Sequence, residues 1–498
     1  MTENRRSHAV VLGASMAGLL AARVLADHYD HVVVVDRNPL TAAPQHRRGV
    51  PQDRHLHGLH PRGQHILTEL FPGLDEQLDR AGAVRGDMLG DARYLMSGHR
   101  FRQAPIGLRG VVCSRTLLEA QVRARVRALP QVRFLTCAIT GLTSSADRRR
   151  ITGVRVWPSH GEERTIATDL VVDATGRGSR TPAWLEGLGY ARPAEERVQI
   201  GIGYATRAFR LRPAARSGNF LAVCGGTPAR PRSGFLAAQE DGRHMVSVAG
   251  ILGDHPPTDL DGFLAFARTL AMDDIADALE GAEPLDDGAA FRFPASVRRR
   301  YERLRAFPAG LLVIGDAVCS FNPVYGQGMT VAAMEAELLR GQLARNRVPD
   351  ARRWFRAVAR VVDAPWQVAV GADLAYPEVA GRRTPQVRLV NSYLPRLHAA
   401  AATDATLAEA FVRVVGLLDR PEGLLRPDRV VRVGWDRLRR GAPWLRRRPA
   451  VQPGLTSGPD ARADLGADGA GLIPGAPGHG CPPGAPAEPE AARQRPAA

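Results

Sequence analysis

The 498-residue sequence contains no lysine, so arginine supplies all 67 of its basic side chains. Without lysine the chain cannot form a Schiff base, use a catalytic lysine or complete a Walker A phosphate loop. The five cysteines are scattered along the chain without a CxxC pair, which argues against a disulfide framework and against a cysteine zinc site. We therefore expect reduced thiols and no metal.

Long apolar runs are also missing from the sequence. No uninterrupted run reaches the roughly 20 residues that a membrane-spanning helix needs. The first residues, MTENRRSH, are polar and have no signal-peptide pattern. A hydrophobic content of 44% is typical of globular proteins, and the length allows two or three domains. We expect a cytoplasmic protein without a transmembrane segment.

The formal net charge of +16 raises the question of nucleic-acid binding. The arginines are spread along the chain, and no recognisable nucleic-acid module accompanies them. We therefore expect a solvated basic surface and no nucleic-acid partner. Attraction of a phosphorylated cosubstrate or an acidic carrier protein remains an open alternative.

The strongest local pattern is a strand–helix–strand unit from Ser7 to Arg37. An apolar strand ends at Gly13, an Ala/Leu-rich helix follows, and a second apolar strand ends at Asp36. Gly13 permits a tight turn, while the small residues Ser15 and Gly18 allow close backbone approach to a pyrophosphate at the helix N-terminus. Asp36 stands where an acid accepts hydrogen bonds from a ribose hydroxyl. The unit predicts a dinucleotide site.

Two further loops follow apolar strands, at Ala174–Ser179 and at Gly315–Gly328. Loops at the carboxyl ends of parallel strands meet at one edge of a sheet, so we expect them to share a crevice with Gly13–Gly18. A helix begins after Gly326-Gln327-Gly328, and its N-terminus would stabilise negative charge. Together the loops predict a ligand longer than a single nucleotide.

The remaining patterns predict the surroundings of this crevice. Val132–Val156 has the pattern of a small sheet layered on the parallel one, and 186–293 alternates as antiparallel strands do. The expected domains are a discontinuous dinucleotide-binding domain of 1–185 and 291–365, a substrate domain of 186–290, a helical region of 366–450 and a disordered tail of 451–498. His55, His57, His60 and His65 match no metal-ligand spacing, and we expect one or two of them to line a pocket.

The three loops resemble the single-component FAD-dependent monooxygenases, the group with aromatic hydroxylases and squalene epoxidase. The resemblance extends to about Val370. The stretches RRGVPQDRHLHGL, VVDATGRGSR and NPVYGQGM are most similar to bacterial epoxidases of polyene and polyether precursors, such as the lasalocid-type epoxidase. The implied fold is α/β, with a Rossmann-like FAD-binding domain interleaved with an antiparallel-sheet substrate domain and a helical C-terminal region.

The resemblance also implies the residues that contact FAD. They are Gly13, Ala14, Ser15, Met16, Ala17, Gly18, Asp36, Arg37, Arg48, Arg115, Asp316, Gly328 and Met329. Thr175 replaces the aspartate of the family's middle motif, and Cys319 stands where many members have histidine. These departures leave open how NAD(P)H is used, either as a cosubstrate at the flavin or through a separate reductase.

The implied activity is a monooxygenase reaction in secondary metabolism. One atom of dioxygen would enter an apolar organic substrate by alkene epoxidation or aromatic hydroxylation, via a flavin hydroperoxide. The sequence identifies no catalytic residue, although His57, Tyr204 and Tyr325 are expected beside the pocket. The alternatives are an FAD-dependent reductase that saturates isoprenoid double bonds and a nucleotide-binding sensor without turnover. A flavin halogenase is disfavoured because its chemistry resembles a lysine-dependent reaction.

Overall fold

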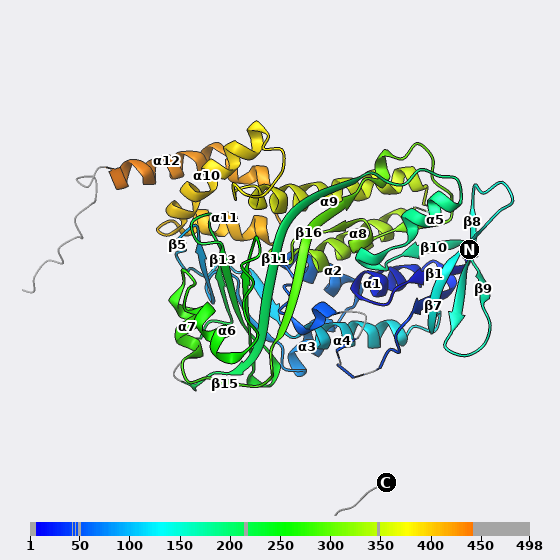
Figure 1. The fold of residues 1–498 in the computed structure, drawn as a ribbon, viewed down its shortest axis with the longest axis horizontal. Coiled ribbons are helices and arrows are strands. Elements are labelled where there is room, and N and C mark those ends of the chain that lie inside the picture. Colours follow the sequence, from blue (N-terminus) through cyan, green and yellow to red (C-terminus); the bar gives the residue numbers. More distant parts are fainter. Residues whose placement is uncertain are drawn as a thin grey trace, which may run out of the picture. The chain divides into compact units, whose positions relative to one another are not determined.

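The computed structural model describes residues 6–41, 43–44, 46–47, 51–213, 218–345 and 349–441 (Figure 1). The described residues belong to one compact unit, in which two large sheets are joined by helices. Arg48 and the predicted tail of 451–498 lie outside the described residues.

The first sheet has seven strands in the order β17-β10-β1-β2-β7-β8-β9. Their bounds are β1 Arg6–Leu12, β2 Tyr29–Asp36, β7 Val132–Ser144, β8 Ile151–Pro158, β9 Arg164–Ala167, β10 Leu170–Asp173 and β17 Leu311–Val313. The five strands from β17 to β7 are parallel, and Val10 of β1 pairs with both Val171 and Val33. Their continuous apolar runs are buried on both faces, as parallel strands require.

Helices cover one face of this sheet, and part of the sheet itself covers the other. α1 (Met16–Leu25), α8 (Gly328–Leu343) and α9 (Ala351–Asp373) share one buried cluster with β1. The long strand β7 pairs first with β2 and then with β8. Residues of β8 are buried against Val10 and Leu12 of β1. This confirms the predicted small sheet layered on the parallel one.

The second sheet has nine strands, with β15 paired to one side of the order β18-β16-β11-β14-β13-β12-β4-β5. Their bounds are β4 Ala92–Met96, β5 His99–Arg100, β11 Glu195–Arg210, β12 Leu221–Cys224, β13 Arg232–Ala238, β14 His244–Gly250, β15 Glu283–Pro284, β16 Ala289–Arg299 and β18 Cys319–Ser320. The long strands β11 and β16 run side by side over much of the fold (Figure 1). Strands β4 and β5 come from the range predicted as FAD-binding domain, so the two sheets are interleaved in sequence.

The second sheet is covered on one face and faces a cavity with the other. α6 (Leu260–Ala267) and α7 (Asp273–Leu279) cover the first face, where Phe263 packs with Val248. Tyr204 and Phe291 lie among the side chains of the opposite face that line the cavity. The alternating pattern of 186–293 thus forms antiparallel strands as predicted.

The C-terminal part of the described chain is helical. It contains α10 (Pro385–Ala401), α11 (Ala405–Val415) and α12 (Pro427–Gly441), which gather at one end of the fold (Figure 1). Leu407, Phe411 and other apolar side chains form a stripe on α11, and they are buried in a cluster with residues of β4. No helix in the described ranges is long and apolar enough to cross a membrane.

Short elements complete the described chain. They are α2 Pro61–Leu70, α3 Leu74–Arg80, β3 Val84–Asp87, β6 Arg109–Val112, α4 Arg115–Arg127, α5 Thr181–Gly187 and short 3-10 helices in several loops, such as Pro51–Arg54 and Pro421–Leu425. Ser114 caps α4, because its hydroxyl accepts a hydrogen bond from the Leu117 amide at 3.1 Å.

We predict that Gly18→Ala destabilises the fold by about 2 kcal/mol or more. A Cβ at position 18 would lie 1.9 Å from the carbonyl oxygen of Gly13, so backbone must move to admit it. Gly341→Ala in α8 is the matched control, because apart from the adjoining residues and backbone of the helix itself nothing lies within 4 Å of the added Cβ. It should stabilise the chain by about 0.5–1 kcal/mol. Urea unfolding measures both, and equal effects of the two substitutions would contradict the prediction.

Candidate functional site

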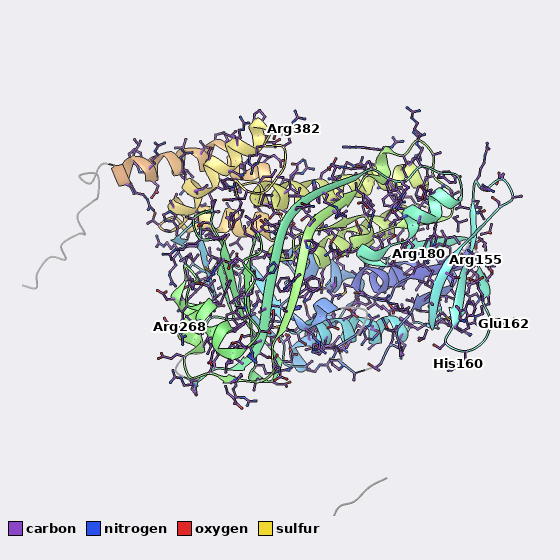
Figure 2. All side chains as sticks on the ribbon, in the orientation of Figure 1. Arg155, His160, Glu162, Arg180, Arg268 and Arg382 are labelled. Carbon is purple, nitrogen blue, oxygen red and sulfur yellow. The ribbon has the colours of Figure 1, made fainter. Side chains whose placement is uncertain are left out.

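One large cavity of about 1880 Å³ lies between the two sheets and the C-terminal helices. Residues of all three predicted loops line it, among them Ser15, Thr175 and Asp316. The loops therefore share one crevice, as predicted from their positions at strand ends. Figure 2 labels Arg180, after β10, and Arg382, between α9 and α10, and both residues line the cavity.

The first loop brings an uncapped helix N-terminus to this cavity. Gly13 has a φ of +96°, and a Cβ there would lie 2.7 Å from the carbonyl oxygen of Ala174. Ser15 is the N-cap of α1, and its side chain makes no capping hydrogen bond among the described residues. Free N–H groups and the helix dipole at such an end favour an anion.

A buried ionic cluster surrounds this helix end. The Arg47 guanidinium donates to the Asp36 carboxylate at 2.9 Å, to Glu119 at 2.7 Å and to the carbonyl oxygen of Ala14 at 2.9 Å. Arg115 donates to Glu119 at 2.9 Å and to the Ser15 hydroxyl at 3.0 Å. Burial opposes the charge of Glu119, but Arg115 and Arg47 outweigh it and lower the pKa of that carboxyl. Glu119 is therefore ionised, and its ion pairs fix the loop.

Asp173 holds the second loop in place. This fully buried carboxylate ends β10 and accepts from the Thr175 amide at 2.9 Å and the Thr175 hydroxyl at 2.6 Å. The hydroxyls of Ser179 and Thr181 donate to its other oxygen at 2.5 and 2.6 Å. Asp173 therefore anchors this loop. It lies two residues before Thr175, and Thr175 is the residue that replaces the aspartate of the family's middle motif.

The third loop places Asp316 and the start of α8 at the cavity. Burial raises the pKa of the Asp316 carboxyl, and Arg177 of the neighbouring second loop partly opposes this effect. The Arg177 guanidinium lies over the Phe293 ring, 4.3 Å from its centroid. Gln327, the N-cap of α8, makes no side-chain capping bond in the described chain, so a second free helix N-terminus lies beside the first.

Glu335 lies behind the third loop and was not singled out from the sequence. Its side chain is fully buried, and one carboxyl oxygen accepts from the Gly315 amide at 2.5 Å. Burial raises the pKa of Glu335 to about 8. The sequence does show an acidic residue within the otherwise largely apolar stretch Met329–Ala336. Helical periodicity alone does not indicate that this residue is buried or what it contacts.

A tyrosine and a buried aspartate form another contact that the sequence did not predict. The Tyr325 hydroxyl and the Asn322 amide donate to the same oxygen of Asp373, both at 2.9 Å. Burial raises the pKa of Asp373 to about 6. Tyr325 lines the cavity, so a group that can take up a proton lies directly behind a cavity hydroxyl.

The four histidines separate into different surroundings. His57 and His60 line the cavity, and His60 Nε2 donates to the carbonyl oxygen of Tyr325 at 2.8 Å. Burial lowers the pKa of His57 to about 3, so its imidazole is neutral. His55 is buried beside Thr206, whereas His65 pairs with Glu69. Among the described residues no group of His, Cys, Asp and Glu could hold a metal ion.

The predicted cofactor residues fall into three groups. Most line the cavity: Gly13, Ser15, Met16, Ala17, Asp36, Arg37, Arg115, Asp316, Gly328 and Met329. Ala14 and Gly18 act behind it, since the Ala14 amide donates to Asp36 at 2.9 Å and Gly18 packs against Gly13. Arg48 lies outside the described residues, and Arg47 next to it is the arginine that contacts Asp36.

Comparisons with known proteins agree with this architecture. The flavin-dependent brominase Bmp2 has a similar structure, with a TM-score of 0.62 and 15% identity, covering 87% of this chain and all of that one. A kynurenine 3-monooxygenase of Salinispora arenicola is 27% identical over 369 residues, which are 67% of this chain and 72% of the relative. No family model matches the chain. The chain thus has the fold of the flavin-dependent monooxygenases and halogenases.

A nearer relative defines the family. Protein Rv3254 of Mycobacterium tuberculosis (strain ATCC 25618 / H37Rv) is 38% identical over 433 residues, which are 84% of this chain and 90% of the relative. The chain belongs to the same family as Protein Rv3254.

We predict a pH-dependent stability effect from Glu335. The folded chain keeps a proton on this carboxyl up to about pH 8, whereas its ordinary pKa is 4.5. The unfolded state therefore binds fewer protons between these values, and the free energy of unfolding falls as pH rises. The Glu335→Gln variant lacks this titration. As pH rises, its free energy of unfolding should therefore increase relative to that of the wild type by up to about 1.4 kcal/mol per pH unit.

Urea unfolding of both proteins at pH 5, 6.5 and 8 measures this difference. Glu378→Gln, at an exposed glutamate, is the control and should follow the wild type at every pH. Parallel pH profiles for Glu335→Gln and the wild type would contradict the prediction.

Proposed function

We propose that the chain is an FAD-dependent monooxygenase that oxygenates an apolar organic substrate. The observation that carries the proposal is the convergence of three strand-end loops and two uncapped helix N-termini on one cavity. This arrangement suits a long cofactor with an anionic centre, and a single nucleotide would use only the first loop.

The described residues fit FAD on chemical grounds. The N-terminus of α1 would hold the pyrophosphate, and Asp36 still has lone pairs for a ribose hydroxyl although Arg47 and Ala14 donate to it. Asp316 and the N-terminus of α8 would face the flavin side. Gln327 Oε1 is buried without a hydrogen-bond partner in the described chain, which suits a donor on a ligand.

When bound and reduced, FAD supplies the activation of dioxygen, with one oxygen atom going to the substrate and the other to water. The chain's own residues position the substrate and exclude water. Burial keeps the His57 imidazole neutral, and Tyr325 with Asp373 can hold or pass on a proton at the cavity wall. We assign no nucleophile, because the proposed chemistry needs none.

The far part of the cavity supports an apolar substrate. Its lining includes Met88, Tyr94, Met96, Val223, Phe235, Leu394, Val414 and Leu424. The volume of about 1880 Å³ exceeds the roughly 300–1,000 Å³ of ordinary ligand pockets, so it offers room for a cofactor and a large substrate together. Epoxidation of an alkene and hydroxylation of an arene both suit this lining. NAD(P)H or a separate reductase would supply the electrons.

Two other activities share this scaffold. A reductase that saturates isoprenoid double bonds would use the same cofactor site and the same apolar lining. The similar structure of a brominase makes halogenation a further candidate activity. The reaction of flavin halogenases resembles a lysine-dependent one, however, and this chain contains no lysine. We therefore retain the reductase as the second candidate.

We predict that the purified chain binds FAD and that Asp316→Ala weakens this binding by about 10- to 100-fold, the range for losing a charge-assisted hydrogen bond. Asp261→Ala, at an exposed aspartate of α6, should leave the affinity unchanged. Titration of the apoprotein with FAD, followed by flavin fluorescence, measures both. A wild-type chain that cannot be reconstituted with FAD would overturn the proposed function.

A separate prediction concerns oxygen. The FAD-loaded protein, supplied with NAD(P)H or a reductase and screened with apolar alkenes and arenes, should incorporate one atom from ¹⁸O₂ into the product. Mass spectrometry detects the label, and strict anaerobiosis should stop turnover. Unlabelled, saturated product formed without oxygen would favour the reductase. Reduced flavoprotein that fails to reoxidise in air with any substrate would favour a sensor.

A further inference from the structure

An exposed apolar surface lies on α12, outside the cavity. Eight large hydrophobic side chains are exposed in the described chain, and five of them fall between Leu425 and Leu438. Val431, Trp435 and Leu438 are 69%, 50% and 60% exposed. Their spacing of four and three residues places them on one face of the helix. Concentrated apolar exposure of this kind marks an interaction surface.

The opposite face of α12 holds the helix on the protein. Val433 is 5% exposed and packs in the cluster that contains Leu407 and Phe411 of α11. Arg432 pairs with Asp404 at 2.9 Å, and Arg440 donates to the carbonyl oxygen of Ala399 in α10 at 2.5 Å. The helix is therefore fixed by one face while its second apolar face remains exposed.

Cations flank the exposed face. Arg437 and Arg439 are exposed on its two sides, and the Arg439 guanidinium lies 5.4 Å from the centre of the Trp435 ring. An apolar face with an aromatic residue and flanking arginines is the pattern of a helix that lies in the plane of a membrane interface. Anionic headgroups complement these arginines, and an apolar protein surface would leave them without counter-charges.

We propose that this face of α12, formed by Val431, Trp435, Leu438, Arg437 and Arg439, docks on an anionic membrane surface. The cavity approaches the same place, since Leu424 and Leu425, just before α12, line it. An apolar substrate dissolved in the membrane would thus enter from the docked side. This last step rests on the proposed function, whereas membrane docking does not.

Vesicle binding of the full-length protein tests the docking. We expect the chain to cosediment with vesicles of phosphatidylglycerol and phosphatidylcholine, and far less with phosphatidylcholine alone. Salt at 0.5 M should weaken the binding because it screens the arginines. Leu438→Glu and the double variant Arg437→Gln/Arg439→Gln should each lower the partition coefficient at least tenfold.

Two matched variants serve as controls for this experiment. Trp157→Ser changes another exposed aromatic residue, and Arg268→Gln changes an exposed arginine that Figure 2 shows beside α6, away from α12. Both should bind vesicles as the wild type does, and circular dichroism should show all variants folded.

Absent binding to anionic vesicles, or wild-type binding by Leu438→Glu, would overturn the docking proposal. A concentration-dependent dimer that dissociates in Leu438→Glu, without vesicle binding, would show instead that the face joins two copies of the chain. The assay contains neither FAD nor substrate, so its failure is distinguishable from failure of the proposed function.

Discussion

The architecture depends on a close backbone approach at the end of β1. Gly13 turns the chain so tightly that a Cβ there would meet the carbonyl of Ala174, and Gly18 admits α1 against that same turn. This packing sets the ends of β1 and β10 at one level, and β17 follows through its pairing with β10. The loops that follow these three strand ends, with Ser15, Thr175 and Asp316, consequently lie around one cavity.

The charges around this cavity divide into two kinds. Near α1, the carboxylates of Asp36 and Glu119 are paired with arginines. Behind the third loop, burial raises the pKa values of Glu335 and Asp373 to about 8 and about 6, and no arginine contacts either in the described chain. The first environment suits an anionic nucleotide. The second is drier, and it suits the flavin and apolar substrate of the proposed reaction because water is largely excluded there.

The residues that would select the substrate are not the ones that define the fold. A brominase that is only 15% identical to this chain has a similar architecture. Since one fold can support different reactions, the two sheets alone do not define the reaction. The side chains that would determine the reaction come from the second sheet, from α9 beginning at Trp366, and from α10 and α11. Together they line the far part of the cavity. These helices also carry the exposed face of α12, so the region that would select the substrate adjoins the region proposed to meet its source.

The sequence determined features that depend on near neighbours along the chain. The turn at Gly13, the Ser114 cap, the apolar stripe of α11 and the alternation of β11 all follow from local spacing. Tertiary structure decided what residues far apart in sequence do together. Arg47 meets Asp36 and Glu119, Asp373 meets Tyr325, and β4 joins the second sheet only because distant segments pack there. Burial, which shifts the pKa of Glu335, is likewise a property of the folded chain, and no spacing of residues encodes it directly.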